Sequence, residues 1–138
     1  MAGHDVIELL QRRNDALLEN DPGAFAGLFA PDAVIEQPFA PQGMPTRLEG
    51  RETIRAFAAR MFASLRFDSI EEIAVHRTDD RDVAIVEQIT NVTFRTSGGS
   101  FSGRSISLFR VRDGAIVLFR TYTGPVPDLA PKRDVSGG

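Results

Sequence analysis

The stretch that decides the fold is FAPDAVIEQPFAPQGMPTRLEGRETIRAFAARM, residues 29–61. A short β-prone run over residues 33–37 ends at Pro38, because proline has no N–H to donate to a sheet ladder. Residues 38–45 form an irregular, proline-rich loop, and the apolar side chains within it predict that the loop folds over something. After Gly50, apolar residues recur at spacings of three and four, which predicts an amphipathic helix over residues 51–64. We therefore expect a strand, a loop and a helix that form the mouth of a ligand-binding cone.

Composition predicts one globular domain. The 138 residues are 42% hydrophobic and 25% charged, which is enough for a single core. The net charge is −3 and Lys and Arg do not cluster on any predicted face, so neither nucleic acid nor an anionic membrane is an expected partner. Without cysteine, a disulfide framework, a thiolate nucleophile and a Cys-ligated metal are excluded. No export signal or run of about 20 apolar residues is recognisable, so we expect a cytoplasmic protein.

Two helices are expected before the opening stretch. Apolar residues over 5–19 follow a helical period, and Asp5 with Glu8 three residues later forms a capping-box signature. Asp21 can cap a second, short helix, and Pro22 suits its first position, because the N–H that proline lacks would have had no partner there. The buried side of that helix is expected to include Phe29, and Pro31 is expected to end it.

The second half of the chain changes to the period of β-strands. Runs over 67–77, 83–95, 101–112 and 115–123 are β-prone, and Asp113-Gly114 is a strong hairpin signal between the last two. Three N-terminal helices packed on a curved antiparallel sheet predict an α+β fold with a cone-shaped cavity. We expect a single domain over residues 1–123 and an extended Pro/Gly-rich tail over 124–138.

Several short motifs resemble the nuclear transport factor 2-like superfamily, in particular its polyketide-cyclase-like (SnoaL-like) and ketosteroid-isomerase-like branches. The motifs are NDP at 20–22, LFAPDAV at 28–34, LEGRETIRAF at 48–57 and VRDGAI at 111–116. Each motif is mostly capping and turn chemistry, but their order and spacing together are fairly specific over residues 5–123. The resemblance implies a cystatin-like α+β barrel and a homodimer formed through the outer face of the sheet. It does not imply one activity, because this fold hosts many.

The resemblance also implies where catalytic residues would lie. Alignment with the isomerase pattern places Arg13 where that branch has a tyrosine, Gln37 where it has the aspartate base, and Ser107 where it has a protonated aspartate. All three positions depart from the pattern. Because glutamine cannot accept a proton at a useful pKa, steroid-type isomerisation by that mechanism is not expected.

Candidate site residues follow from this register and from strand alternation. Gln37 and Ser107 are candidate hydrogen-bonding groups for a substrate, and Glu36 is a candidate base only if the register slips by one residue. The candidate ligand-binding residues are Arg13, Phe57, Met61, Phe109, Phe119 and Thr121. Against these roles, the aromatic residues and Met61 would serve equally as core, Gln37 and Ser107 could satisfy each other or the backbone, and Arg13 could lie on a solvated face or pair with a strand carboxylate.

Other ionisable residues are expected outside the cavity. Alternation along 83–95 turns Gln88 inward and Glu87 outward, and His76 is more readily a surface histidine than a cavity residue. The carboxylates of Asp79, Asp80 and Asp82 fit a solvated turn better than a metal loop. No metal and no cofactor are expected.

Two functions from different classes remain open. The first is a cofactor-independent isomerase, cyclase or hydratase acting on a hydrophobic, oxygenated metabolite of polyketide, steroid or terpenoid type. In this enzyme Gln37 and Ser107 would stabilise a developing oxyanion, and Glu36, Glu87 or His76 would move protons. The second is a non-catalytic module that binds a ligand in the cone or dimerises through the outer sheet face, where Ile85, Ile89 and Leu118 are expected. A carboxylate inside the cavity would favour the enzyme.

Overall fold

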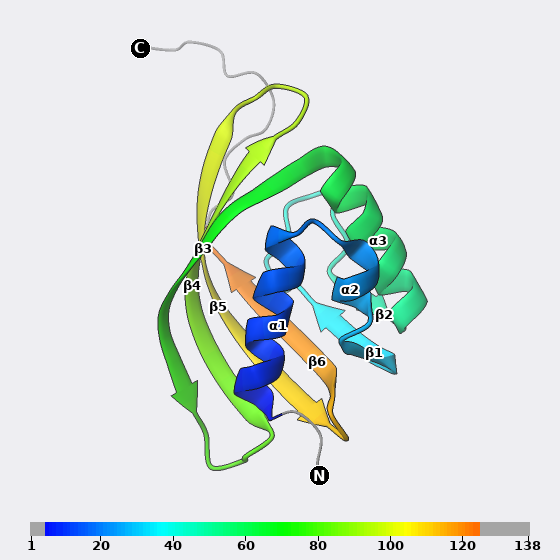
Figure 1. Cartoon of the computed structure of the whole chain (residues 1–138), viewed down its shortest axis with the longest axis vertical. Helices are drawn as coiled ribbons and strands as arrows, with labels where there is room; N and C mark the ends of the chain where they lie inside the picture. The colour runs from blue at the N-terminus through cyan, green and yellow to red at the C-terminus, as the bar shows by residue number, and fades with distance from the viewer. Residues whose placement is uncertain (1–4, 125–138) are drawn as a thin grey trace.

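The computed structural model describes residues 5–124 (Figure 1). The helices are α1 (Val6–Leu18), α2 (Pro22–Ala26) and α3 (Arg51–Ser64). The strands are β1 (Phe29–Glu36), β2 (Arg47–Glu49), β3 (Leu65–Arg77), β4 (Val83–Phe94), β5 (Ser100–Arg112) and β6 (Ala115–Thr123). The predicted tail over 124–138 lies outside the described residues except for Gly124.

Capping chemistry sets the start of the first two helices as predicted. The Asp5 carboxylate accepts a hydrogen bond from the backbone N–H of Glu8 at 2.9 Å, and the Asp21 carboxylate accepts one from that of Ala24 at 3.0 Å. Each bond satisfies a donor that the helix itself leaves without a partner. Pro22 occupies the first position of α2.

The prediction that the second helix includes Phe29 and ends at Pro31 is wrong. Helix α2 ends at Ala26, and the carbonyl of Leu28 already accepts a hydrogen bond from the N–H of Ile116 at 2.9 Å, so the chain joins the sheet there. Pro31 therefore lies inside β1. The strand tolerates it because the pairing of β1 with β6 shifts register between Phe29 and Val34, where no ladder donor is needed.

One six-stranded sheet has the order β2-β1-β6-β5-β4-β3. The four long strands agree closely with the sequence prediction, and Asp113 and Gly114 both have positive φ, 54° and 79°, as their hairpin requires. The prediction of an antiparallel sheet is correct for β3 to β6. It is wrong for β1, which runs parallel to β6, with Ile35 beside Phe119. Strand β2 was not predicted, since three residues are too few to show a period. Helix α3 follows β1 and β2, so the three helices do not all precede the sheet.

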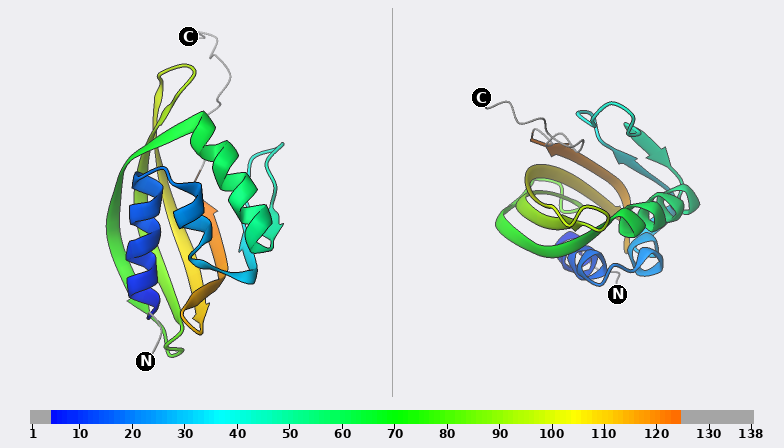
Figure 2. Two further views of the ribbon diagram at one scale, coloured as in Figure 1. Left: turned by 45° about the vertical axis from the view of Figure 1, so that its right-hand side comes forward. Right: turned by 90° about the horizontal axis from the view of Figure 1, so that it is seen from above.

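The sheet is curved and unclosed, and its concave face is covered by the helices (Figure 2). A single cluster of buried apolar side chains joins α1, α2, α3 and this face; its largest fully buried members include Phe29, Phe109, Leu9 and Ile54. The α+β architecture is therefore as predicted. Within residues 5–124, no helix has both the length and the apolar character needed to cross a membrane.

Gly50 joins β2 to α3 in a backbone conformation reserved for glycine. Its φ is 93° and its ψ is 143°, its N–H donates to the Ala33 carbonyl at 2.8 Å, and its own carbonyl accepts the first hydrogen bond of α3 from Ile54 at 3.0 Å. Residues with a Cβ rarely adopt this conformation. A single residue thus sets the angle at which α3 leaves the sheet.

Gly50→Ala should lower the free energy of unfolding by about 1–3 kcal/mol, because the added Cβ strains the backbone. The strain is conformational, since the nearest atom to that Cβ, the carbonyl oxygen of Pro31, would lie at an ordinary 3.8 Å. Urea denaturation measures the change. The matched control is Gly124→Ala, whose φ is not in the positive region and whose Cβ would lie 3.6 Å from the carbonyl oxygen of Arg104. Equal losses in the two variants would contradict the assignment of strain to Gly50.

Candidate functional site

A cavity of about 310 Å³ lies between the helices and the concave face of the sheet. Its walls are mainly apolar and come from every layer: Leu17 on α1, Phe25 on α2, Met61 on α3, and Ile35 and Phe119 on the sheet. A volume of this size is at the low end of small-molecule sites. The cavity is therefore large enough for a molecule of at most a few fused rings.

The loop between β1 and β2 lines the same cavity with Phe39, Pro41 and Met44. Gln37 joins the two ends of this loop. The backbone N–H of Gln37 donates to the Thr46 carbonyl at 2.8 Å, and its side-chain Nε2 donates to the Pro45 carbonyl at 3.2 Å. The side chain of Gln37 also lines the cavity. Its Oε1 accepts no hydrogen bond from a described residue, so it is the atom that Gln37 can offer to a ligand.

Arg13 is the most unusual residue of the cavity wall. It is 8% exposed although it carries a charge, and its guanidinium carbon lies 5.3 Å from the ring centre of Phe109 and 4.8 Å from that of Phe119. Its Nη1 donates to Asn14 Oδ1 at 2.9 Å and to Gln88 Oε1 at 3.2 Å. Gln88 Nε2 in turn donates to Asn14 Oδ1 at 3.2 Å. Two neutral amides and two aromatic rings thus surround the guanidinium.

This environment leaves the charge of Arg13 only partly compensated. Burial lowers the pKa of Arg13 to about 10, which keeps the guanidinium charged at neutral pH. Aromatic faces attract a cation, but Arg13 Nε is buried without a hydrogen-bond partner. No carboxylate of residues 5–124 lies within ion-pair distance of Arg13. The sequence alternatives for Arg13, a solvated face or a strand carboxylate, are therefore not what the structure shows.

The structure places the inward-facing candidates at two depths. Gln37, Phe57, Met61, Phe119 and Thr121 line the cavity with Arg13. Ser107 and Phe109, each 1% exposed, lie in the layer behind it. Ser107 Oγ donates to Thr121 Oγ1 at 2.9 Å, and the ring of Phe109 stacks on that of Phe119 with centroids 4.7 Å apart. These two residues therefore contact the cavity through their neighbours.

Glu36 lies on the opposite face of β1 from Ile35 and Gln37. Its carboxylate accepts hydrogen bonds from Arg120 Nε and from Arg47 Nη1, each at 2.7 Å. The hydrogen bond from Arg120 is the main cause that lowers the pKa of Glu36, and Arg47 adds to it. A carboxylate stabilised in its charged form is a weaker base, so its geometry suits a structural ion pair between β1, β2 and β6.

The remaining ionisable candidates are also outside the cavity. His76 Nε2 and Glu87 Oε2 lie 2.7 Å apart in an exposed pair on β3 and β4. Asp80 caps its own turn by accepting a hydrogen bond from the N–H of Asp82 at 2.9 Å. Within the part of the chain that the structure describes, no three His, Cys, Asp or Glu side chains are grouped so as to hold a metal ion.

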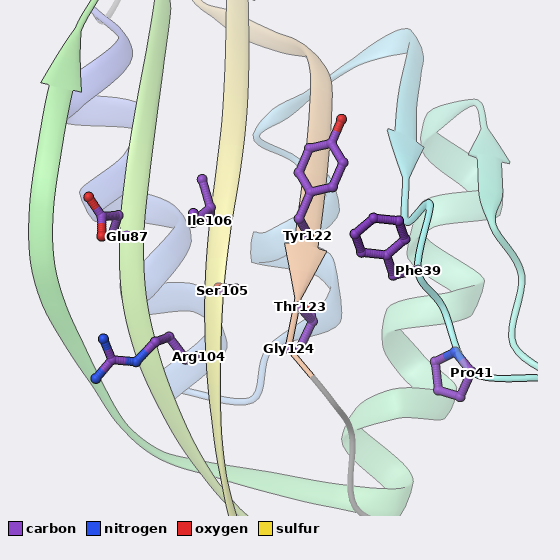
Figure 3. Close-up of a pocket in the computed structure, with 9 residues that line it drawn as sticks. All are labelled: Phe39, Pro41, Glu87, Arg104, Ser105, Ile106, Tyr122, Thr123 and Gly124. Carbon is purple, nitrogen blue, oxygen red and sulfur yellow. The ribbon is translucent and has the colours of Figure 1, made fainter.

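A second, open hollow lies on the outer face of the sheet, opposite α1 (Figure 3). Its centre is apolar: Ile106 is 49% exposed, and the ring of Tyr122 meets that of Phe39 edge-on with centroids 5.6 Å apart. Glu87 and Arg104 flank this centre. Because Phe39 also lines the inner cavity, the loop between β1 and β2 contributes to both hollows.

Gln88, which accepts a hydrogen bond from Arg13, is a residue that the site prediction missed, although its inward direction was expected. Along β4 the even-numbered residues face inward, and Gln88 is the amide in a series otherwise made of Ala84, Val86, Thr90, Val92 and Phe94. A long polar side chain at a strand position that faces the core implies a buried hydrogen-bond partner. That partner is 75 residues earlier in the chain, so no local pattern could identify it as Arg13.

Gln88→Leu should lower the free energy of unfolding by about 1–3 kcal/mol, because it removes a buried hydrogen-bond acceptor from a charged group. The double variant Arg13→Met/Gln88→Leu should lose less than the sum of the two single variants, since it removes the charge together with its acceptor. Chemical denaturation of the four proteins gives the interaction free energy. Additive losses would show that Gln88 does not support Arg13.

Known proteins are similar to this chain in sequence or in fold. The chain is 40% identical over 114 residues to an uncharacterized PhzA/B-like protein of Pseudomonas aeruginosa, which covers 82% of this chain and 80% of that protein. A crystal structure of a proposed isomerase from Bacillus subtilis superposes with a TM-score of 0.81 at 29% identity and covers 86% of each chain. Rv0760c from Mycobacterium tuberculosis, crystallised with estradiol-17beta-hemisuccinate, superposes with a TM-score of 0.74 at 20% identity over 83% of this chain and 90% of that one.

The sequence profile of the SnoaL-like domain matches residues 10–119, which hold all three helices except the first residues of α1 and nearly the whole sheet. Solved structures described as ketosteroid isomerase-like or as polyketide cyclases share the fold. The resemblance deduced from the sequence motifs is therefore confirmed, and the protein belongs to the SnoaL-like domain family of the nuclear transport factor 2-like superfamily.

Proposed function

We propose that this protein binds a small, mainly apolar, oxygenated molecule in the cavity between its helices and its sheet. The observation that carries the proposal is the cavity itself: apolar walls on every side with a few polar side chains, Arg13, Gln37 and Thr121 among them. Concave sites of this composition are where proteins bind small molecules. Phe57, Met61 and Phe119 would contact the apolar body of the ligand, and Ser107 and Phe109 would fix Thr121 and Phe119 from behind.

Relatives with this fold support the proposal. Rv0760c was crystallised with a steroid ester, and a ketosteroid isomerase-like protein of Catenulispora acidiphila was crystallised with trimethylamine. Both superpose on this chain with TM-scores of 0.70 or more. The fold therefore accommodates small molecules of different chemistry, and the side chains of each cavity select among them.

Binding is better supported than isomerase, cyclase or hydratase chemistry. An oxyanion could be stabilised by Arg13, but proton transfer also needs an acid or a base. Among residues 5–124, the cavity is lined by no aspartate, glutamate or histidine. Gln37 and Ser107 can donate and accept hydrogen bonds but not take up a proton at neutral pH. A non-catalytic, ligand-binding role is thus the conclusion that the geometry favours.

Filling the cavity should weaken ligand binding without unfolding the protein. Thr90 is half-buried on β4 and lines the cavity, so a phenyl ring in Thr90→Phe would occupy ligand space. We expect 2-naphthol to bind saturably to the wild-type protein and about tenfold or more weakly to this variant. The sequence contains no tryptophan, so naphthol fluorescence can be titrated against a low protein background.

Thr93→Phe is the matched control. Thr93 is also half-buried on β4, but its hydroxyl donates to Asp68 Oδ2 at 2.6 Å on the other face of the strand, and it lines neither hollow. Circular dichroism would establish that both variants are folded. Equal naphthol affinity in wild-type and Thr90→Phe proteins would contradict binding in this cavity.

The outer hollow favours a second role, association with another copy of the chain. Ile106 and Tyr122 present an exposed apolar centre, and Glu87 and Arg104 supply charges of opposite sign beside it. A two-fold interface places the same patch on both copies, so an apolar centre flanked by both charges is complementary to itself. We propose a homodimer through this face.

Ile106→Glu should convert the dimer into a monomer, because it would place one carboxylate from each copy in the apolar centre of the interface. Sedimentation velocity over a dilution series measures the change. Ile73→Glu is the matched control, since Ile73 is similarly exposed, 45% against 49%, but does not line the hollow. A wild-type protein that is monomeric at every concentration would refute the dimer.

A further inference from the structure

The guanidinium of Arg13 has one edge in use and one edge free. Nη1 makes both of its hydrogen bonds, to Asn14 and Gln88. Nε is buried with no partner, and Nη2 makes no hydrogen bond to any described residue. The free edge, Nε with Nη2, presents two parallel N–H groups, which is the fork that a carboxylate accepts side-on.

The groups already around Arg13 cannot satisfy this edge. Phe109 and Phe119 contact the guanidinium through their rings, and rings accept no strong hydrogen bond in the guanidinium plane. Asn14 and Gln88 are neutral amides whose carbonyl oxygens are both taken by Nη1. A buried charge is normally paired, and the described residues bring no carboxylate to it.

We propose that the ligand of the cavity is a carboxylic acid whose carboxylate binds the Nε–Nη2 edge of Arg13. This inference rests on the proposed binding function and names its chemical class. Arg13 is itself part of the cavity wall, and because its Nε is closed to solvent in the empty cavity, a small movement of the side chains around it would bring the carboxylate to this edge. The remainder of the ligand is apolar and compact, since the rest of the wall is mainly apolar and the cavity measures about 310 Å³.

The same arrangement explains why Arg13 is held by amides and not by an acid. A carboxylate from the protein would neutralise the guanidinium permanently and compete with the ligand. Amide carbonyls fix one edge of the guanidinium and leave its charge uncancelled. Phe109 and Phe119 stack with their ring planes 7° apart, and this stacking fixes both rings beside the guanidinium. The site is therefore preorganised for an anion before the anion arrives.

The test compares 2-naphthoate with 2-naphthamide, which have the same ring system and differ in charge. Isothermal titration calorimetry at neutral pH should show the acid binding to the wild-type protein about tenfold or more tightly than the amide, since hydrogen bonds between charged groups are the stronger ones. Arg13→Met should remove this preference. Arg12→Met removes the same charge from the exposed neighbour on α1 and should keep it.

A second readout follows Arg13 directly. The Nε–H signal of Arg13, assigned in ¹H–¹⁵N spectra by its loss in Arg13→Lys, should move further downfield on saturation with 2-naphthoate than on saturation with 2-naphthamide, because only the acid supplies a charged acceptor. Because the comparison of the two probes uses the wild-type protein, it holds even if Arg13→Met fails to fold.

The outcomes separate this inference from the proposed function. Equal affinities for acid and amide, with no selective shift of the Arg13 signal, would overturn the carboxylate inference and leave the binding cavity standing. An acid preference that persists in folded Arg13→Met would also overturn it. Failure of both naphthyl probes and of 2-naphthol to bind at millimolar concentration would overturn the binding function together with the inference.

Discussion

A positive charge enclosed in an apolar core is the constraint on which this structure depends. Arg13 can remain charged there only because elements far apart in the sequence converge on it: the amide of Gln88 from β4 and the rings of Phe109 and Phe119 from β5 and β6. Each of these groups compensates part of the cost of removing the guanidinium from water. Helix α1 is thereby fixed to the middle of the sheet through a polar contact as well as through its apolar face.

The two faces of the sheet differ in their polar groups. On the concave face the polar groups are few and directed at one another or at the cavity, as with Ser107 and Thr121. On the outer face charges are frequent and paired, as with Glu36 and its two arginines. Ionisable carboxylates are thus kept on the side where water can solvate them. Relatives with the same fold can therefore differ in chemistry by changing a few inward-facing positions.

Much of the fold was predictable from the sequence because its signals are local. Caps such as Asp5 and Asp21, the hairpin at Asp113-Gly114 and the alternation that turned Gln88 inward all lie within a few residues of what they determine. The parts that were not predictable are non-local. The parallel pairing of β1 with β6 and the hydrogen bond between Arg13 and Gln88 both depend on which distant segments become neighbours. Whether the predicted site residues act on a ligand remains a prediction, since position alone does not establish a role.

The parallel pairing of β1 with β6 has a consequence for how the molecule forms. Ile35 lies beside Phe119, so one of the two neighbours of β1, a strand from the first third of the chain, is the last strand of the sheet. Such long-range pairing costs loop-closure entropy early and slows folding. During synthesis on the ribosome, α1, β1 and β2 emerge well before β6, and the wall that carries Phe119 and Thr121 is the last to arrive. The cavity is therefore completed at the end of folding, and a nascent chain that lacks its final strand has no site for a ligand.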